Sequence, residues 1–446
     1  MIELIREHGF AAQGRGPYDG PPKASRGTSC RRHPPRSSWQ SPMTMLEDFP
    51  PTRQAALSRI SAVRPGDYAR SRNAIEGAVT GLSPYITHGL VNLPEVLAGV
   101  TVKHPLDVQH KFVFELGWRE YFRHVWAFRG EGIFESLHEG LLPQTSYSAL
   151  LPADIRQAAT GVPVIDMAVR TLYATGYLHN HARMWLASYV VQVRKVDWRI
   201  AADWLYGHLL DGDLASNHLS WQWVAGTGSS KPYLFNADNV ARYAPAPWHS
   251  PGSVIDQSYE ALDRLARQPM RHARNEQYAP SQDSLIEPPL LAKPPSDLVW
   301  TQPEAAAVAG REVWLVHPWN LGDLPTSLPA NTVVVGVFVT DFHRTWPWSE
   351  RRWRFVASRM AELAALRWQG DAAALGAALQ GATQVRSVDE PHLAPWLARL
   401  AVCESAVALF PAVARRCDSF SQWWTRASRG FATASDLLAA RQAPAQ

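Results

Sequence analysis

The sequence pattern changes across a proline-rich segment, and this change limits the folds open to the chain. Ten prolines lie between residues 245 and 303, a composition that predicts a semi-rigid, partly extended connection. Before this segment, apolar residues recur at the spacing of amphipathic helices, as in residues 106–129. After it, short β-type runs alternate with helical stretches. The sequence therefore predicts a helical domain followed by a small α/β domain with a parallel, Rossmann-like sheet.

These patterns divide the chain into four predicted segments. They are a disordered tail (1–45), a helical domain (46–250), a proline-rich linker (251–310) and a small α/β domain (311–440). The tail is rich in Gly, Pro, Arg and Ser and has no apolar period, which is typical of disorder. In the last segment, β-type runs lie at 313–316, 332–339, 384–388 and 405–410, and helical patterns at 350–366 and 372–379.

Composition narrows the function classes only modestly. The formal charge of +4 permits nucleic-acid binding without requiring it. No run of eighteen apolar residues occurs, so a membrane span is not expected. The three cysteines, Cys30, Cys403 and Cys417, form no C-x-x-C pair, which disfavours a disulfide framework, a zinc ribbon or an iron–sulfur cluster. We therefore expect a cytoplasmic protein with incidental thiols.

Four short motifs carry the chemistry. Asp211–Trp223 gathers two acidic residues, an asparagine and two tryptophans, and Gly176–Met184 precedes it. In Glu115–Phe122, the residues Glu115, Trp118 and Arg119 share one helix face because they are three and four positions apart. Thr80–Tyr85 combines hydroxyls with a helix entry, an arrangement that binds anions but also occurs as an ordinary Ser-Pro helix start.

Together these motifs resemble the flavin-binding helical domain of the DNA photolyase and cryptochrome family, over roughly residues 55–240. The resemblance implies bound FAD. The residues that would hold it are Tyr68, Thr80, Gly81, Leu82, Ser83, Phe112, Glu115, Arg119, Asn180, Arg183, Asp211, Gly212, Asp213 and Asn217. The α/β domain looks like the family's antenna domain, which normally precedes the helical domain and here would follow it. Whether it binds an antenna pigment, a folate or a deazaflavin, stays open.

The resemblance also assigns roles in catalysis. The residues concerned are Glu115, Trp118, Asn180, Met184, Trp198, Trp221 and Trp223. Glu115 would bond the damaged base, Trp118 and Trp223 would stack on it, and Trp221 and Trp198 would pass electrons to the flavin. Photolyases of cyclobutane pyrimidine dimers (CPDs) have Asn and Met at the positions of Asn180 and Met184, whereas (6-4) photolyases have histidines there.

The resemblance thus implies a light-driven flavoprotein, a deoxyribodipyrimidine photolyase-like lyase that repairs CPDs in UV-damaged DNA and acts as a monomer. A cryptochrome-like blue-light photoreceptor with a signalling partner is the alternative, and a flavin protein without a light role is a third. No metal is expected, because His179 and His181 lack a third ligand at suitable spacing. Gly226–Lys231 lacks the spacing of a phosphate-binding loop, and Pro232 follows it.

Overall fold

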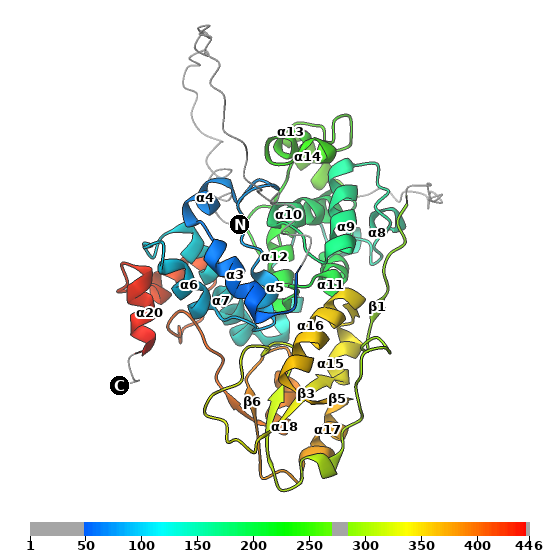
Figure 1. The fold of residues 1–446 in the computed structure, drawn as a ribbon. Coiled ribbons are helices and arrows are strands. Elements are labelled where there is room, and N and C mark those ends of the chain that lie inside the picture. Colours follow the sequence, from blue (N-terminus) through cyan, green and yellow to red (C-terminus); the bar gives the residue numbers. More distant parts are fainter. Residues whose placement is uncertain (1–48, 270–283, 443–446) are drawn as a thin grey trace, which may run out of the picture.

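The computed structural model describes residues 49–269 and 284–442 (Figure 1). The chain first forms a helical part (residues 49–269) and then an α/β part (residues 312–404), which lies below the helices in Figure 1. The predicted disordered tail, residues 1–45, lies outside the described residues. No helix within the two described ranges is long and apolar enough to cross a membrane.

The helical part is built from short helices whose ends are set by capping residues. At the start of α6, Asn92 and Glu95 cap each other's backbone N–H groups, and Gly176, at a φ of 68°, ends α9. The helices are α3 (Arg53–Ala62), α4 (Pro65–Ser71), α5 (Ser83–Thr87), α6 (Leu93–Thr101), α7 (Lys111–Arg129), α8 (Ala153–Arg156), α9 (Pro163–Thr175), α10 (Asn180–Ser188), α11 (Trp198–His208), α12 (Leu214–Ala225), α13 (Ala237–Tyr243) and α14 (Tyr259–Ala266).

Five parallel strands form the sheet of the α/β part, in the order β5-β3-β2-β6-β7. Its elements are β2 (Glu312–Val316), β3 (Val333–Val339), α15 (Thr340–Thr345), α16 (Glu350–Leu363), β5 (Leu366–Gly370), α17 (Ala372–Leu379), β6 (Gln384–Val388), α18 (Ala394–Leu400) and β7 (Val402–Glu404). The strand order reverses between β2 and β6, as in doubly wound sheets. The predicted combination of a helical region and a parallel α/β region is confirmed.

Several features of the second half differ from the sequence prediction, including β5, which was not among the expected strands. The strand expected at 405–410 is wrong: β7 ends at Glu404, and the N–H groups of Leu409 and Phe410 donate to the Glu120 carboxylate on α7 rather than to a neighbouring strand. The proline-rich segment is also partly ordered, because it contains α14 and the short strand β1 (Leu290–Leu291), which pairs with β4 (Trp348–Ser349).

The end of the chain returns to the helical part. Helices α19 (Phe420–Ala427) and α20 (Ala434–Gln442), which fall within the segment predicted as α/β domain, pack on α7 and α6 (Figure 1). Gly117 on α7 makes room for this contact, since a Cβ there would lie 2.5 Å from the Trp424 ring. The backbone of Val108 also donates to Ala432.

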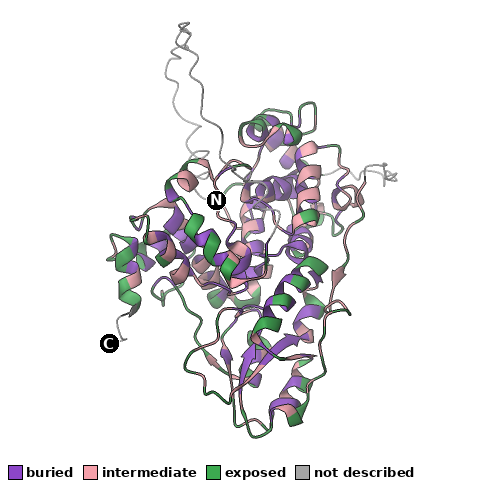
Figure 2. Ribbon diagram, in the orientation of Figure 1, coloured by how far each residue is buried: buried purple, intermediate pink, exposed green. Residues whose placement is uncertain are grey.

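The two parts share a continuous apolar core. One cluster of buried side chains comes from residues between 151 and 255, within the helical part. A second cluster joins the two parts, because it extends from the first helices through the sheet to α19 and α20. In Figure 2 the strands and the central helices are accordingly coloured as buried. Tyr85 of α5 packs against Phe355 of α16, with ring centroids 5.8 Å apart. The α/β part is therefore docked on the helices that carry the predicted site.

Candidate functional site

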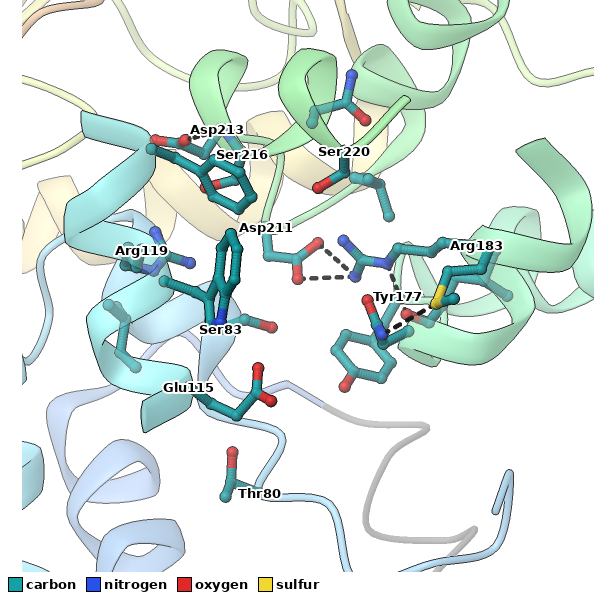
Figure 3. A pocket seen from close by; sticks show the side chains of 18 of the residues that line it. Thr80, Ser83, Glu115, Arg119, Tyr177, Arg183, Asp211, Asp213, Ser216 and Ser220 are labelled. Carbon is teal, nitrogen blue, oxygen red and sulfur yellow. Dashed lines mark hydrogen bonds and ion pairs between the residues drawn. The ribbon is translucent and has the colours of Figure 1, made fainter. Parts of the chain in front are cut away.

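A cavity of about 290 Å³ is enclosed mainly by residues of α7, α10 and α12 (Figure 3). The segment before α5 and the turn between α11 and α12 complete its wall. Fourteen of the predicted site residues line it: Tyr68, Thr80, Ser83, Phe112, Glu115, Trp118, Arg119, Asn180, Arg183, Met184, Asp211, Asp213, Asn217 and Trp221. Segments far apart in the sequence are thus brought to one concave site.

Helical spacing explains which part of α12 faces the cavity. Asn217, Ser220, Trp221 and Val224 line it, at relative positions of zero, three, four and seven. Trp223 does not, because it lies two positions after Trp221. It is half-buried instead, and its ring is 5.7 Å from that of Tyr233.

Four other predicted residues also lie outside the cavity lining. Gly81, Leu82 and Gly212 belong to the backbone segments that carry lining side chains. Trp198 begins α11, is 3% exposed and donates its indole N–H to the Ser136 hydroxyl at 3.1 Å. The roles assigned to Trp198 and Trp223 stay predictions.

Two of the predicted FAD-binding residues, Arg183 and Asp211, form an ion pair (Figure 3). One terminal nitrogen of Arg183 lies 2.9 and 2.8 Å from the two carboxylate oxygens of Asp211. The Nε–H of Arg183 donates to the Leu178 carbonyl at 2.7 Å, which fixes the guanidinium plane. Burial alone would raise the pKa of Asp211, but the charge and hydrogen bonds of Arg183 hold it below its ordinary value.

Asp213 is the second buried carboxylate of the site. It caps α12 by accepting the Ser216 N–H at 2.8 Å, and it accepts a hydrogen bond from Arg123 at 2.7 Å. Burial would raise its pKa, yet Arg123, His392 and Arg119 lower it well below the ordinary range. Asp213 is therefore ionised and held in one orientation.

Arg119 differs from the other two arginines. Within the described residues, its guanidinium donates a hydrogen bond to a neutral group, the Thr87 hydroxyl, at 3.0 Å. Burial lowers its pKa, whereas Asp213 and Asp211 act in the opposite direction from a longer range. Because this partner carries no charge, the Arg119 guanidinium can still bind an anionic ligand with two parallel N–H···O hydrogen bonds.

Four of the predicted lesion-binding residues, Glu115, Trp118, Asn180 and Met184, line the cavity, whereas Trp223 does not. Trp118 has one face stacked on Phe420 of α19, with ring centroids 3.8 Å apart and planes 11° apart. Its buried indole N–H has no hydrogen-bond partner within residues 49–269 and 284–442. The Asn180 amide contacts the Met184 sulfur at 3.5 Å. Glu115 lies 3.7 Å from Arg72.

Sequence reasoning missed several residues of this site. Tyr177 and Ser216 line the cavity, and burial raises the pKa of Tyr177 to about 12. Both lie within the motif segments 176–184 and 211–223, so their position in the sequence was a usable signal. Glu390, which bonds Arg123 at 2.6 Å across 267 positions of sequence, offered no such signal.

Comparison with known proteins gives this geometry a family. Residues 112–265 match the family described as the FAD binding domain of DNA photolyase. This segment is similar to the FAD-binding domain of photolyases. The matched segment begins at residue 112, inside α7. Cavity-lining residues that come earlier in the chain, such as Thr80 and Ser83, therefore lie outside the match.

Several curated relatives match this chain over only part of their length. Deoxyribodipyrimidine photo-lyase of Synechococcus sp. is 32% identical over 208 residues, 43% of this chain and 43% of that protein. The enzyme of Streptomyces griseus is 34% identical over 226 residues, 44% and 47% of the two chains. Cryptochrome DASH of Idiomarina loihiensis is 29% identical over 194 residues, 41% and 43%. The chain thus spans less than half the length of these relatives.

Among solved structures, a Synechocystis cryptochrome shares 28% identity and covers 43% of each chain, with a TM-score of 0.39.

The residues present fit FAD. The Arg119 guanidinium and the hydroxyls of Thr80 and Ser83 suit a diphosphate, because they provide positive charge and donors near the start of a helix. Apolar side chains such as Phe112, Leu116 and Leu205 suit an aromatic ring system.

Proposed function

We propose that the cavity binds FAD and that the chain repairs cyclobutane pyrimidine dimers in UV-damaged DNA under light. One observation carries the proposal: Asn180 and Met184 line the same cavity as Glu115, Trp118 and the Arg183–Asp211 pair. The photolyase-type FAD-binding segment supports it further. When bound, reduced FAD supplies the absorption of light and the electron that opens the cyclobutane ring.

The cofactor-facing residues bind and orient. Arg119 and the hydroxyls of Thr80 and Ser83 hold the diphosphate. The Arg183–Asp211 pair presents one positive and one negative group to the cofactor in a fixed orientation. The orientation is fixed because Arg183 donates both to Asp211 and to the Leu178 carbonyl. The Asn217 amide is oriented by its bond to the Ala202 carbonyl at 2.8 Å and offers its remaining polar groups to the cofactor.

The lesion-facing residues give the site its preference for a dimer. Trp118 is backed by Phe420 on one face, so its other face provides a firm platform for a base flipped out of the duplex. Glu115 accepts a hydrogen bond from the base edge. Asn180 and Met184 contribute no titrating proton, whereas a (6-4) site needs a histidine acid. The protein acts on DNA as a monomer in the cytoplasm.

The proposal is tested by repair of UV-irradiated thymine oligonucleotides with FAD-loaded, reduced protein under blue light. We expect CPDs to disappear in light and persist in the dark, and (6-4) products to persist in both. If FAD is bound but the amount of CPD is the same in light as in the dark, the protein does not repair CPDs.

A second candidate, a blue-light photoreceptor, is favoured by the burial of Trp221 and Trp198, at 2% and 3% exposure. Buried tryptophans near a flavin serve photoreduction without any DNA. If repair fails while FAD still photoreduces, and Trp221→Phe slows that photoreduction sharply, this second function replaces the first.

A further inference from the structure

The turn between α11 and α12 places both site carboxylates. This segment, Leu210–Leu214, is named the acidic turn here, and it carries Asp211 and Asp213 on the cavity wall. Its glycine is required by packing: a Cβ at Gly212 would lie 2.5 Å from an Arg352 nitrogen and 2.8 Å from the Tyr206 carbonyl. The turn is thus pressed directly against the α/β part.

Three side chains hold the backbone of the acidic turn, and each is tied to the α/β part. Arg352 of α16 donates to the Gly212 carbonyl at 2.6 Å. His392, between β6 and α18, accepts the Leu214 N–H at 3.2 Å. His88 lies between two carbonyl oxygens, 2.9 Å from Leu210 and 2.6 Å from Pro318 after β2. All three side chains are at most 3% exposed.

A buried chain of charges reinforces the contact at His392. Because Nε2 of His392 accepts the Leu214 N–H, its proton is on Nδ1, which lies 2.5 Å from Glu390. Glu390 accepts from Arg123 at 2.6 Å, and Arg123 donates to Asp213 at 2.7 Å. The loop after β6 therefore contacts the acidic turn in two ways. His392 accepts the backbone N–H of Leu214, and Glu390 is linked through Arg123 to a carboxylate oxygen of Asp213.

The loop itself is held rigidly at the edge of the sheet. Trp319, after β2, stacks on the His392 ring, with centroids 4.5 Å apart and planes 13° apart. Trp126 of α7 meets the same ring edge-on at 4.9 Å. β2 and β6 are the neighbours at which the strand order reverses, where doubly wound sheets usually bind a ligand. In this chain the loops at that edge contact the acidic turn.

We propose that the α/β part acts as a positioning element for the cavity, with His392 as its main contact. It sets the geometry of Asp211 and Asp213 and thereby the affinity for FAD. The inference rests on the proposed function for the identity of the ligand. Coupling of this kind is reciprocal, so FAD in the cavity also stabilises the loop that carries His392.

The test compares two buried histidines of the α/β part. His392→Leu removes the acceptor for Leu214 and the donor to Glu390, whereas His392→Gln restores an acceptor. His343→Leu is the matched control, because His343 is 1% exposed and packs between Trp348 and Trp353. Within the described residues, His343 forms no hydrogen bond with the acidic turn.

Two readouts are measured. In flavin-free protein, amide hydrogen exchange at residues 210–216 should be faster in His392→Leu than in the wild type or His343→Leu. In FAD titrations followed by fluorescence, His392→Leu should bind roughly tenfold more weakly. His392→Gln should recover most of the affinity, and His343→Leu should stay within about twofold of the wild type. FAD should also slow exchange at residues 389–393 of the wild type.

The possible outcomes separate this inference from the proposed function. Equal losses of affinity in His392→Leu and His343→Leu, or unchanged exchange and affinity in His392→Leu, would overturn the positioning role. A wild type that takes up no FAD would refute the proposed function, while the flavin-free exchange still decides whether His392 holds the turn. If His392→Leu does not fold, the nearly isosteric Glu390→Gln replaces it, and unchanged affinity in that variant overturns the inference.

Discussion

At the scale of single residues, the site depends on charges that are paired inside a cavity. Arg183 satisfies both oxygens of Asp211, which is 7% exposed. Removing the cation from a buried ion pair destabilises the folded protein, because the carboxylate is left buried without a partner. Here that carboxylate is Asp211, which is expected to face the cofactor.

Arg183→Ala should therefore yield a protein with little FAD and with a free energy of unfolding lower by roughly 3 kcal/mol. Flavin absorbance of the purified protein and urea denaturation measure the two effects. Arg267→Ala is the control, since its pair with Asp263 is exposed on α14 and contributes little. Retention of FAD at the wild-type level in Arg183→Ala would rule out this pair as a cofactor contact.

Trp118 offers a second test at this scale. Trp118→Ala should weaken binding to CPD-containing DNA by about 1–3 kcal/mol per stacked base, while FAD content stays intact. Binding to undamaged DNA should change little, because it rests mainly on phosphate contacts. Fluorescence anisotropy with matched damaged and undamaged duplexes measures both. The control is Trp396→Ala, a half-buried tryptophan on α18. Equal wild-type affinity for the two duplexes would argue against a lesion pocket.

At the scale of elements, α7 has two working faces. One lines the cavity with Phe112, Glu115 and Arg119, and the other receives α19 at Gly117. Trp424 cannot move aside easily, because it is 6% exposed and donates its indole N–H to Gln109 at 2.9 Å. The end of the chain is thus fitted to the helix that supports the site.

Gly117→Ala should lower the free energy of unfolding by about 1–3 kcal/mol, since the new methyl group overlaps the Trp424 ring. Gly66→Ala is the matched control on α4. Its Cβ would meet only the flexible end of Arg70, at 3.5 Å, so its stability should be equal or higher. Urea denaturation of both variants decides. Wild-type stability in Gly117→Ala would mean that α19 is not held in this position.

At the scale of the whole molecule, the helical and α/β parts are joined by buried charges as well as by a shared core. Burial would raise the pKa of Glu390, but Arg123 and His392 lower it from 4.5 to about 2. The ionised form is therefore favoured in the folded protein. Its contribution to stability is present above pH 4.5 and is lost as the pH falls toward 2.

Wild-type protein should accordingly lose more stability between neutral pH and about pH 3 than Glu390→Gln, which has no proton to gain at this position. At neutral pH the variant should be the less stable of the two, because Arg123 keeps only Asp213 as a carboxylate partner. Thermal denaturation across this pH range measures the difference. Parallel pH profiles would show that Glu390 does not link the two parts.

The sequence by itself determined the features that depend on local spacing. The helical and β-type periods predicted the two kinds of architecture. The four motifs contain twelve of the predicted residues that line the cavity, and the family resemblance added Tyr68 and Phe112. Glu115, Trp118 and Arg119 share a face because the helix repeat requires it.

Only the tertiary structure decided which side chains meet across long separations of sequence. Phe420 reaches Trp118, and His392 reaches Leu214 across 178 positions, through packing that no local pattern encodes. Such contacts depend on how whole elements dock. A sequence period specifies which face of an element is buried, but the partner of that face is chosen by the complementary shapes and charges of the folded chain.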